Sequence, residues 1–388
     1  MWYIYKIILF KLKRKFEGNF IGSLEISFPN KKIFIFGESS KVSRIKVKSN
    51  LFLFKLLFLG IPYLGHGYFK GDWVTENLEE LLALGIKNKK LLNSIPVFNI
   101  FLFIVTKISK IFESNTLKKS KSQISFHYDL GNNFYNLWLD KSMTYSSALF
   151  KNSKTLEKAQ YNKYKNLARE TNINKNNTVL EIGCGWGGFV KYVNDNIGAK
   201  ITGITISKKQ FDYAKQNNNK LTNIKLLDYR KVNKTYDKIV SIEMFEAVGK
   251  KNWSIFFKTL NNLLNKNGQA GLQIITISEP NYSYYLQRKD FIQKYIFPGG
   301  MLPTKKILNR LALQNNLLIK ECKSFSQDYA KTLALWRKNF IANWDNIEKL
   351  GFDKNFKRLW EYYLCYCEVG FKTGVIEVSQ FILKKGNE

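Results

Sequence analysis

The sequence predicts an α/β protein in which a doubly wound parallel sheet forms the larger domain and a small α+β domain precedes it. Strand and helix patterns alternate between residues 178 and 277, and a glycine-rich turn joins the first strand of this series to the first helix. Alternation of this kind builds parallel sheets that bind ligands at the carboxyl ends of their strands. With 388 residues, 45% of them hydrophobic, the chain is long enough for two domains and a large core.

The glycine-rich turn lies in residues 179–190, which read VLEIGCGWGGFV. An apolar run ends at Glu181, glycines follow at Gly183, Gly185 and Gly187, and a helical pattern begins at once. A turn this sharp requires positive φ angles, which glycine adopts most readily. Any Cβ would also hold a ligand away from the backbone, so both requirements favour glycine. We therefore expect a nucleotide-like ligand at this turn.

The identity of the nucleotide depends on acidic residues near the turn. The glycines also satisfy the GxGxxG pattern of dinucleotide folds, which place a carboxylate at the end of the second strand. Here that strand ends in Thr205 and Ser207. With Glu181 two residues before the first glycine, the turn instead resembles the S-adenosylmethionine turn of class I methyltransferases. A glycine-rich turn without a ligand stays open as the alternative.

The order of elements in the larger domain follows from the hydrophobic periodicity. Parallel strands are expected at Thr178–Ile182, Lys200–Ile206, Ile224–Leu227, Lys238–Ile242 and Gln269–Ile277. Helices are expected at Lys154–Thr171, Gly187–Asn196, Lys208–Asn217 and Trp253–Leu264. Leu317–Cys322 and Val375–Leu383 are expected to close the sheet, the latter as an antiparallel strand. The strand ends carry Glu181, Thr205, Asp228, Glu243 and Ser278, and Asp228 with Tyr229 is expected to meet an adenine ring unless Asp228 only caps a helix.

Residues 1–112 form the expected small domain, residues 113–125 a polar linker, and residues 126–388 the larger domain. Short β-rich runs at Leu24–Phe28 and Lys32–Phe36 flank a Pro-Asn turn, and Arg44–Lys48 alternates as a third strand. Asn77 followed by Glu80 predicts a capped helix over 78–84. The aromatic and polar residues 126–150 have the composition of a lid over a cofactor.

The net charge of +32 favours a polyanionic partner, either nucleic acid or anionic phospholipid. Basic and aromatic residues mix in 2–15 and 52–58, as in segments that lie in a membrane interface. An ordinary core with a solvated basic face explains the same pattern equally well. No apolar run reaches the roughly 20 residues that span a bilayer, so we expect a protein that is soluble or lies on a membrane.

The four cysteines, Cys184, Cys322, Cys365 and Cys367, lack the paired spacing of a zinc site. We therefore expect no metal, and reduced thiols in a cytoplasmic compartment.

Glu246 lies in apolar surroundings, IEMFEAVG, where a carboxylate orients a catalytic anion or water, or caps a helix. The Asp/Asn-Pro-Pro-aromatic tetrapeptide of nitrogen methyltransferases is absent there, which argues against amines and nucleobases as substrates. Residues 291–303, FIQKYIFPGGMLP, predict an apolar channel wall or a structured loop.

Several motifs in family order carry a resemblance to the cyclopropane fatty acid synthase and mycolic acid cyclopropane synthase family. They are HYDLGNNFYNLWLD, MTYSSALF, LEIGCGWGG, GITIS, SIEMFEAVG, FIQKYIFPGGMLP, DYAKTLALW and YYLCYCEVGFKTG, and they cover residues 120–385. The resemblance implies the class I methyltransferase Rossmann-like fold and transfer of a methyl group from S-adenosylmethionine to a cis double bond of an unsaturated phospholipid. It also implies a peripheral protein at the anionic, cytoplasmic face of the inner membrane, with a homodimer left open.

The resemblance implies a cofactor site made of Tyr145, Ser146, Gly183, Cys184, Gly185, Thr205, Ile206, Gln210, Asp228 and Tyr229. It also implies a bicarbonate ion as proton acceptor, held by Glu246, Ile275 and Tyr329. Ser147 and Gln273 stand where the family has a cysteine and a histidine; both still donate hydrogen bonds, but glutamine carries no charge. A methylene- or methyl-branched product and a non-catalytic lipid-binding relative therefore stay open. Cys367 matches a cysteine often regarded as the family's nucleophile, although a packing role near the pocket suits this reaction better.

Overall fold

The computed structural model describes residues 2–60, 62–94, 130–217, 222–287 and 289–386. The chain separates into two compact units, one of Met1–Glu113 with Glu348–Val369 and the other of Ser114–Ile347 with Gly370–Glu388. The expected linker lies outside the described residues. Sequence analysis included residues 348–369 in the larger domain, whereas the structure groups them with the first unit.

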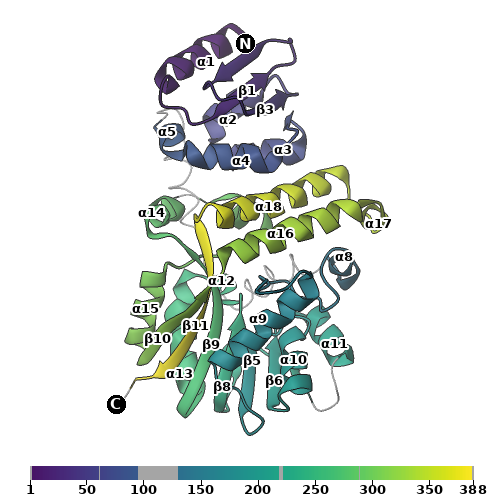
Figure 1. Ribbon diagram of the computed structural model, residues 1–388, viewed down its shortest axis with the longest axis vertical. Coiled ribbons are helices and arrows are strands. Elements are labelled where there is room, and N and C mark those ends of the chain that lie inside the picture. The colour runs from purple at the N-terminus through teal and green to yellow at the C-terminus, as the bar shows by residue number, and fades with distance from the viewer. Residues whose placement is uncertain (1, 61, 95–129, 218–221, 288, 387–388) are drawn as a thin grey trace. The chain divides into compact units, whose positions relative to one another are not determined.

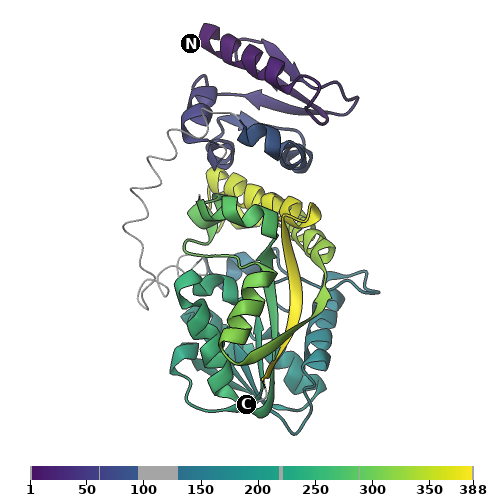
Figure 2. The ribbon, with the colours of Figure 1, turned by 90° about the vertical axis from the view of Figure 1, so that its left-hand side faces the viewer.

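The first unit contains a four-stranded sheet in the order β2-β1-β3-β4. The strands are β1 (Ser23–Ser27), β2 (Ile33–Phe36), β3 (Val42–Val47) and β4 (Trp73–Val74), and β1 pairs antiparallel with β2 and parallel with β3. Figures 1 and 2 show α1 (Trp2–Phe16) on one face of this sheet and α4 (Leu78–Lys87) on the other. Asn77 caps α4 by accepting a hydrogen bond from the Glu80 amide at 3.1 Å, as the sequence predicted.

Aromatic residues join two of the remaining helices of the first unit. The remaining helices are α2 (Phe52–Leu59), α3 (Pro62–Lys70), α5 (Lys89–Asn93) and most of α18 (Lys354–Lys372). The Tyr68 hydroxyl donates to Glu361 at 3.1 Å, and the Tyr68 ring lies 5.6 Å from that of Tyr362. These contacts attach residues 348–369 to a unit from which they are distant in sequence. No described helix is long and apolar enough to cross a bilayer.

The second unit is built on a seven-stranded sheet in the order β10-β11-β9-β8-β5-β6-β7. Its strands are β5 (Thr178–Ile182), β6 (Lys200–Thr205), β7 (Asn223–Leu226), β8 (Tyr236–Ile242), β9 (Leu264–Ile277), β10 (Leu317–Ser324) and β11 (Ile376–Lys385). Strands β5 to β9 run parallel, and β11 lies antiparallel between β9 and β10. The doubly wound sheet and its antiparallel closing strand are therefore confirmed.

Helices cover both faces of this sheet (Figure 1). On one face, α9 (Leu156–Glu170) and α10 (Gly188–Asn196) contribute to a core that includes Leu167 and Val193. On the other, α13 (Trp253–Leu263) and α15 (Lys305–Gln314) bury Phe256 and Leu308. The helix α11 (Lys208–Asn217) contacts β6 and β7. The remaining helices of the unit are α8 (Asn132–Asn136), α12 (Phe245–Val248), α14 (Glu279–Gln287), α16 (Ser326–Ala342) and α17 (Trp344–Glu348).

Candidate active site

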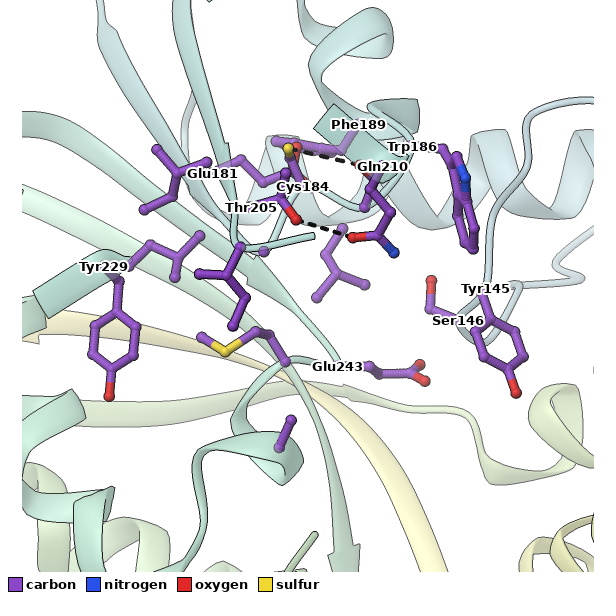
Figure 3. A pocket seen from close by; sticks show the side chains of 18 of the residues that line it. Tyr145, Ser146, Glu181, Cys184, Trp186, Phe189, Thr205, Gln210, Tyr229 and Glu243 are labelled. Carbon is purple, nitrogen blue, oxygen red and sulfur yellow. Dashed lines mark hydrogen bonds between the residues drawn. The ribbon is translucent and has the colours of Figure 1, made fainter. Parts of the chain in front are cut away.

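A pocket lies at the carboxyl ends of β5, β6, β7 and β8, where a doubly wound sheet is expected to bind its ligand. Each of the ten residues that sequence analysis assigned to a cofactor lines it. They are Tyr145, Ser146, Gly183, Cys184, Gly185, Thr205, Ile206, Gln210, Asp228 and Tyr229. Figure 3 shows Tyr229 at one end of this pocket and Tyr145 with Trp186 at the other. The space between them runs along the glycine-rich turn.

The glycine-rich turn forms one wall of the pocket through its backbone. Gly183 has φ +79°, and a Cβ built on it would lie 2.6 Å from Cγ of Met244. The amides of Gly183 and Cys184 both donate to the carbonyl oxygen of Ile204, at 2.9 and 3.0 Å, which fixes the turn to the end of β6. Gly187, at φ +88°, begins α10 in the left-handed conformation. The positive φ that the sequence predicted is therefore present, and the close neighbour of Gly183 is the side chain of Met244.

Glu181 places a carboxylate at the pocket wall. Its side chain is only 2% exposed, and its Oε2 has no hydrogen-bond partner among the described residues. Burial raises the pKa of Glu181 to about 8, although the charge of Lys163 opposes this shift. An unsatisfied buried acceptor beside a glycine cradle fits a ligand that brings cationic or N–H groups, as S-adenosylmethionine does.

Polar residues at the ends of β6 and β7 complete the cofactor half of the pocket. The Thr205 hydroxyl donates to Oε1 of Gln210 at 3.0 Å (Figure 3). Asp228 accepts from the Arg230 amide at 3.0 Å and pairs with the Arg230 side chain, so it caps the short helix that follows. Burial acts to raise the pKa of Asp228, but the hydrogen bonds from Arg230 outweigh it and hold the pKa below its usual range. Tyr229 packs its ring 5.4 Å from that of Phe256.

The segment 143–147 forms the opposite wall and is held by α9. Lys163 donates to the Ser146 hydroxyl at 2.6 Å, and Gln160 donates to the Ser146 carbonyl at 2.9 Å. The Tyr145 ring lies 5.5 Å from Trp138 and 5.3 Å from Trp336. Residues 143–146 line the pocket, the other described residues of the predicted lid, 130–142 and 147–150, do not, and residues 126–129 lie outside the described residues.

Lys163 is a fully buried lysine beside the pocket that sequence analysis missed. Its Nζ lies 4.4 Å above the Tyr164 ring. Burial lowers the pKa of Lys163 to about 7, while the charges of Glu243, Asp140 and Glu181 act to raise it. In the sequence this lysine is one of many cationic residues on an amphipathic helix, so nothing local marks it.

Glu243 brings together three of the residues expected to hold an anion. Its Oε1 accepts hydrogen bonds from the Ser147 amide at 2.8 Å and from Nε2 of Gln273 at 2.7 Å. Its Oε2 accepts from the Tyr329 hydroxyl at 2.5 Å. Glu243 itself lines the pocket, whereas sequence analysis noted it only as a polar strand end. Ser147 contributes its backbone amide, because its hydroxyl donates to the Ala148 carbonyl at 3.0 Å.

The orientation of Gln273 is set by a neighbouring strand. Nε2 of Gln380, on β11, donates to Oε1 of Gln273 at 3.0 Å, so the amide nitrogen of Gln273 faces Glu243. Asn166 in turn donates to Oε1 of Gln380 at 2.7 Å. Both glutamines are fully buried. A chain of side-chain amides therefore runs from α9 to Glu243.

Glu246 and Ile275 form a second contact in this region. Oε1 of Glu246 accepts from the Ile275 amide at 2.5 Å, and Oε2 has no hydrogen-bond partner among the described residues. Burial, followed by the nearby charge of Glu243, raises the pKa of Glu246 to about 8. The Glu246 carbonyl also accepts from the amide of Met301 at 2.9 Å, which anchors the loop 291–303. That loop contains one turn of π-helix and is held by Gln293, as the structured-loop alternative predicted.

Cys367 is the sixth residue that sequence analysis expected to act in catalysis. It lies on α18, in the segment grouped with the first unit, and is not among the residues that line the pocket. Three of the six residues expected to act in catalysis, Ser147, Gln273 and Tyr329, contact Glu243. Glu246 and Ile275 contact each other, and the sixth residue is Cys367.

Comparison with known proteins assigns the family. Residues 115–381 match the family model of mycolic acid cyclopropane synthetase. The tuberculostearic acid methyltransferase of Mycobacterium tuberculosis is 33% identical over 340 residues, which cover 84% of this chain and 79% of that protein. The cyclopropane-fatty-acyl-phospholipid synthase of Escherichia coli is 32% identical over 350 residues, or 89% of this chain and 88% of that protein.

A solved structure agrees with this assignment. The mycolic acid cyclopropane synthase CmaA1, crystallised with SAH and CTAB, superposes with a TM-score of 0.64 and 30% identity over 68% of this chain and 98% of that one. The fold is that of class I methyltransferases, and the glycine cradle with the unsatisfied Glu181 fits the cofactor of that class. This chain is an S-adenosylmethionine-dependent methyltransferase and belongs to the mycolic acid cyclopropane synthase family.

Proposed function

We propose that this protein transfers a methyl group from S-adenosylmethionine to the cis double bond of an unsaturated phospholipid acyl chain and forms a cyclopropane fatty acid. The match to the Escherichia coli cyclopropane-fatty-acyl-phospholipid synthase supports this proposal. The 350 aligned residues are more than the second unit contains, so the similarity includes part of the first unit as well. The structural observation that carries the proposal is a row of aromatic rings that leads from the pocket to an anchored carboxylate.

The aromatic row consists of Tyr145, Trp336 and Tyr329. The rings of Tyr145 and Trp336 lie 5.3 Å apart, those of Trp336 and Tyr329 lie 6.2 Å apart, and the Tyr329 hydroxyl reaches Glu243. An alkene that accepts a methyl group becomes a carbocation, and each aromatic face near a cation stabilises it by about 0.5–2 kcal/mol. A carboxylate at the end of the row suits the loss of a proton that must follow.

The chain contributes mainly by positioning. S-adenosylmethionine supplies a methyl group on a positively charged sulfur, and we expect it to be held by the glycine turn, Glu181, Thr205, Gln210 and Tyr229. An alkene is a weak nucleophile, so alignment of the double bond with that methyl group is the main source of rate, and alignment can contribute about 7–11 kcal/mol. The buried aromatic residues also exclude water, which would otherwise trap the cation.

The test is incubation of the purified protein with methyl-labelled S-adenosylmethionine and vesicles of dioleoyl phosphatidylglycerol, followed by mass spectrometry of the fatty acid esters. We expect a gain of one CH2 group with loss of the double bond. Vesicles of a fully saturated phosphatidylglycerol serve as the control and should gain no label. Label in added RNA, or no transfer to any unsaturated lipid, would contradict the proposal.

A methylene- or methyl-branched fatty acid is the second candidate product. Gln273 favours it, because a neutral amide stands next to Glu243 where the family resemblance expects a histidine that can carry a proton. The same mass gain with a retained double bond, seen by gas chromatography of the esters, would identify this outcome.

We further propose that α1 lies on an anionic membrane surface, at the cytoplasmic face of the inner membrane. Its exposed face combines apolar Ile7 and Phe10 with basic Lys6, Lys11 and Arg14, at the spacing of one helix face. Amphipathic helices of this composition bind interfaces through buried apolar area and attraction to anionic lipid. We call this surface the α1 face.

A further inference from the structure

The Glu243 carboxylate engages the donors that the family resemblance assigns to a bicarbonate ion. The Ser147 amide, Gln273 and Tyr329 all donate to it. The two other expected ligands of that ion, Glu246 and the Ile275 amide, bond to each other at 2.5 Å. Oε2 of Glu246 has no partner among the described residues, but all four donors, the Ser147 and Ile275 amides, Gln273 and Tyr329, already bond to a carboxylate of the chain, so the donors present do not fit a bicarbonate ion.

We propose that Glu243 is the proton acceptor of the reaction, built into the chain where relatives would use a free anion. This inference rests on the lipid methyl transfer proposed above. It gives a role to a residue that sequence analysis noted only as a strand end, and it removes the need for bicarbonate.

The geometry favours an ionised Glu243 with one acceptor position to spare. An ionised carboxylate offers about four acceptor positions, and the three donors around Glu243 leave about one unused. All three neighbours donate, so the site stabilises the charged form, and Gln380 fixes the Gln273 amide in the donating orientation. Since Glu243 also lines the pocket, the remaining acceptor position is available to a substrate there.

The charges around Glu243 support the same assignment. Burial raises the pKa of Glu243, while hydrogen bonds and Lys163 oppose the shift, so the group is a stronger base than an exposed carboxylate. The Glu246 carboxyl, with a pKa of about 8, retains its proton at neutral pH. Three donors face Glu243 and one faces Glu246, so this geometry assigns the charge to Glu243 and the proton to Glu246.

The proton transfer balances without any further reactant. The electron pair of the alkene forms a bond to the methyl carbon while the bond from sulfur to that carbon breaks and its electron pair stays on sulfur, which releases S-adenosylhomocysteine. The neighbouring chain carbon is then cationic. Glu243 then accepts a proton from that methyl group, and the electron pair of the broken C–H bond forms the second C–C bond, which closes the ring and neutralises the cation. Glu243 is left as a carboxylic acid and returns the proton to water.

The backbone conformation at Glu243 allows this side chain to be removed by substitution without backbone strain. Glu243 has φ +50°, in the left-handed region that glycine adopts without strain. Glu243→Gly therefore deletes the carboxylate, frees its three donors and introduces no backbone conflict. Asn316→Gly is the matched control, because Asn316 is exposed, lies outside the pocket and has φ +55°.

The test compares wild type, Glu243→Gly, Glu243→Gln and Asn316→Gly with dioleoyl phosphatidylglycerol vesicles, in buffer purged of carbon dioxide and with added bicarbonate. We expect wild type and Asn316→Gly to turn over equally in both buffers. We expect Glu243→Gln to lose about 100-fold or more in rate, as for loss of a general base. We expect Glu243→Gly to be equally impaired without bicarbonate and to recover about tenfold or more with it, as a free anion fills the vacated donors. Calorimetric affinity for S-adenosylmethionine and thermal melting establish that each variant is folded.

A second measurement needs no turnover. In the presence of S-adenosylhomocysteine, the NMR line of isotope-labelled bicarbonate should broaden with Glu243→Gly and not with wild type. A wild type that requires or binds bicarbonate, a Glu243→Gly that binds none, or a folded Glu243→Gln that turns over at the wild-type rate would overturn the inference. If wild type labels no lipid while the binding result is as expected, the proposed function fails, and Glu243 is still supported as the replacement for the anion.

Discussion

The buried carboxyl group of Glu181 makes the free energy of unfolding depend on pH. Its folded-state pKa of about 8 lies above the ordinary value of 4.5, because burial disfavours the charged carboxylate. The stability contributed by a group of this kind is fully present below the unfolded pKa and is lost as the pH rises through the folded pKa. Stability of the ligand-free protein should therefore fall between these two values.

Glu181→Gln removes that titration. The free energy of unfolding of the variant, relative to wild type, should rise by about 2–4 kcal/mol from about pH 5 to about pH 9, and denaturant unfolding of the ligand-free proteins measures it. Glu348→Gln, which alters an exposed glutamate, is the control and should show no such trend. A Glu181→Gln difference that stays constant with pH would show that the carboxylate is not held neutral.

The residues that line the pocket could be predicted from sequence because each lies in a local motif. Gly183 belongs to a glycine-rich turn, Thr205 is the last residue of β6, and Tyr229 lies three residues after β7. Lys163 and Glu243 act through partners far away in the chain, and a single sequence contains no signal for such contacts. A positive φ at Glu243, the best mark of a special position, is visible only in the structure.

At the scale of elements, β11 acts on the site through β9. The two strands pair with Gln380 opposite Gln273, and the contact between these amides orients the donor that faces Glu243. No residue of β11 lines the pocket, but through Gln273 this strand orients a hydrogen-bond donor to Glu243, which does line the pocket.

Gln380→Met should release the Gln273 amide. We expect product formation to fall about tenfold, as for loss of one buried hydrogen bond, with unchanged affinity for S-adenosylmethionine. The matched control is Gln269→Met, which removes a buried amide from the opposite end of β9, where it accepts from Lys238. Steady-state rates measure product formation, and calorimetry measures the affinity for S-adenosylmethionine. Equal losses of rate in both variants would indicate a general weakening of the sheet.

Periodicity predicted the strands of the second unit well, and it was wrong about the start of β9. The strand was predicted to begin at Gln269, after a helix that ended at Leu264. The structure begins β9 at Leu264, because that residue pairs with Tyr236 of β8 across an irregular register. The helix α1 was not predicted, because the apolar residues of its first ten positions follow one another without helical spacing.

At the scale of the whole molecule, the net charge of +32 predicts a membrane affinity that depends on salt. Each basic residue near an anionic surface contributes about 1 kcal/mol, and counter-ions screen that attraction. Flotation with phosphatidylglycerol vesicles should therefore recover less protein as the ionic strength rises, and neutral vesicles should recover little at any salt concentration.

The α1 face should account for much of this binding. The double variant Ile7→Glu with Phe10→Glu should weaken vesicle binding by about tenfold or more, because it exchanges apolar area for charges that an anionic surface repels. Leu313→Glu is the control, since Leu313 is 65% exposed on α15 in the second unit and lies outside that face. Equal losses in the two proteins would assign the binding to total charge instead.

The position of β11 between β9 and β10 also governs how the protein is made. During synthesis β10 leaves the ribosome long before β11, and it has no partner in the sheet until residues 376–385 follow. A nascent chain therefore exposes the unpaired edges of both β9 and β10 until β11 has been made, which favours aggregation. Completion of the sheet, and with it the orientation of Gln273 by Gln380, must wait until residues 376–385 have been made.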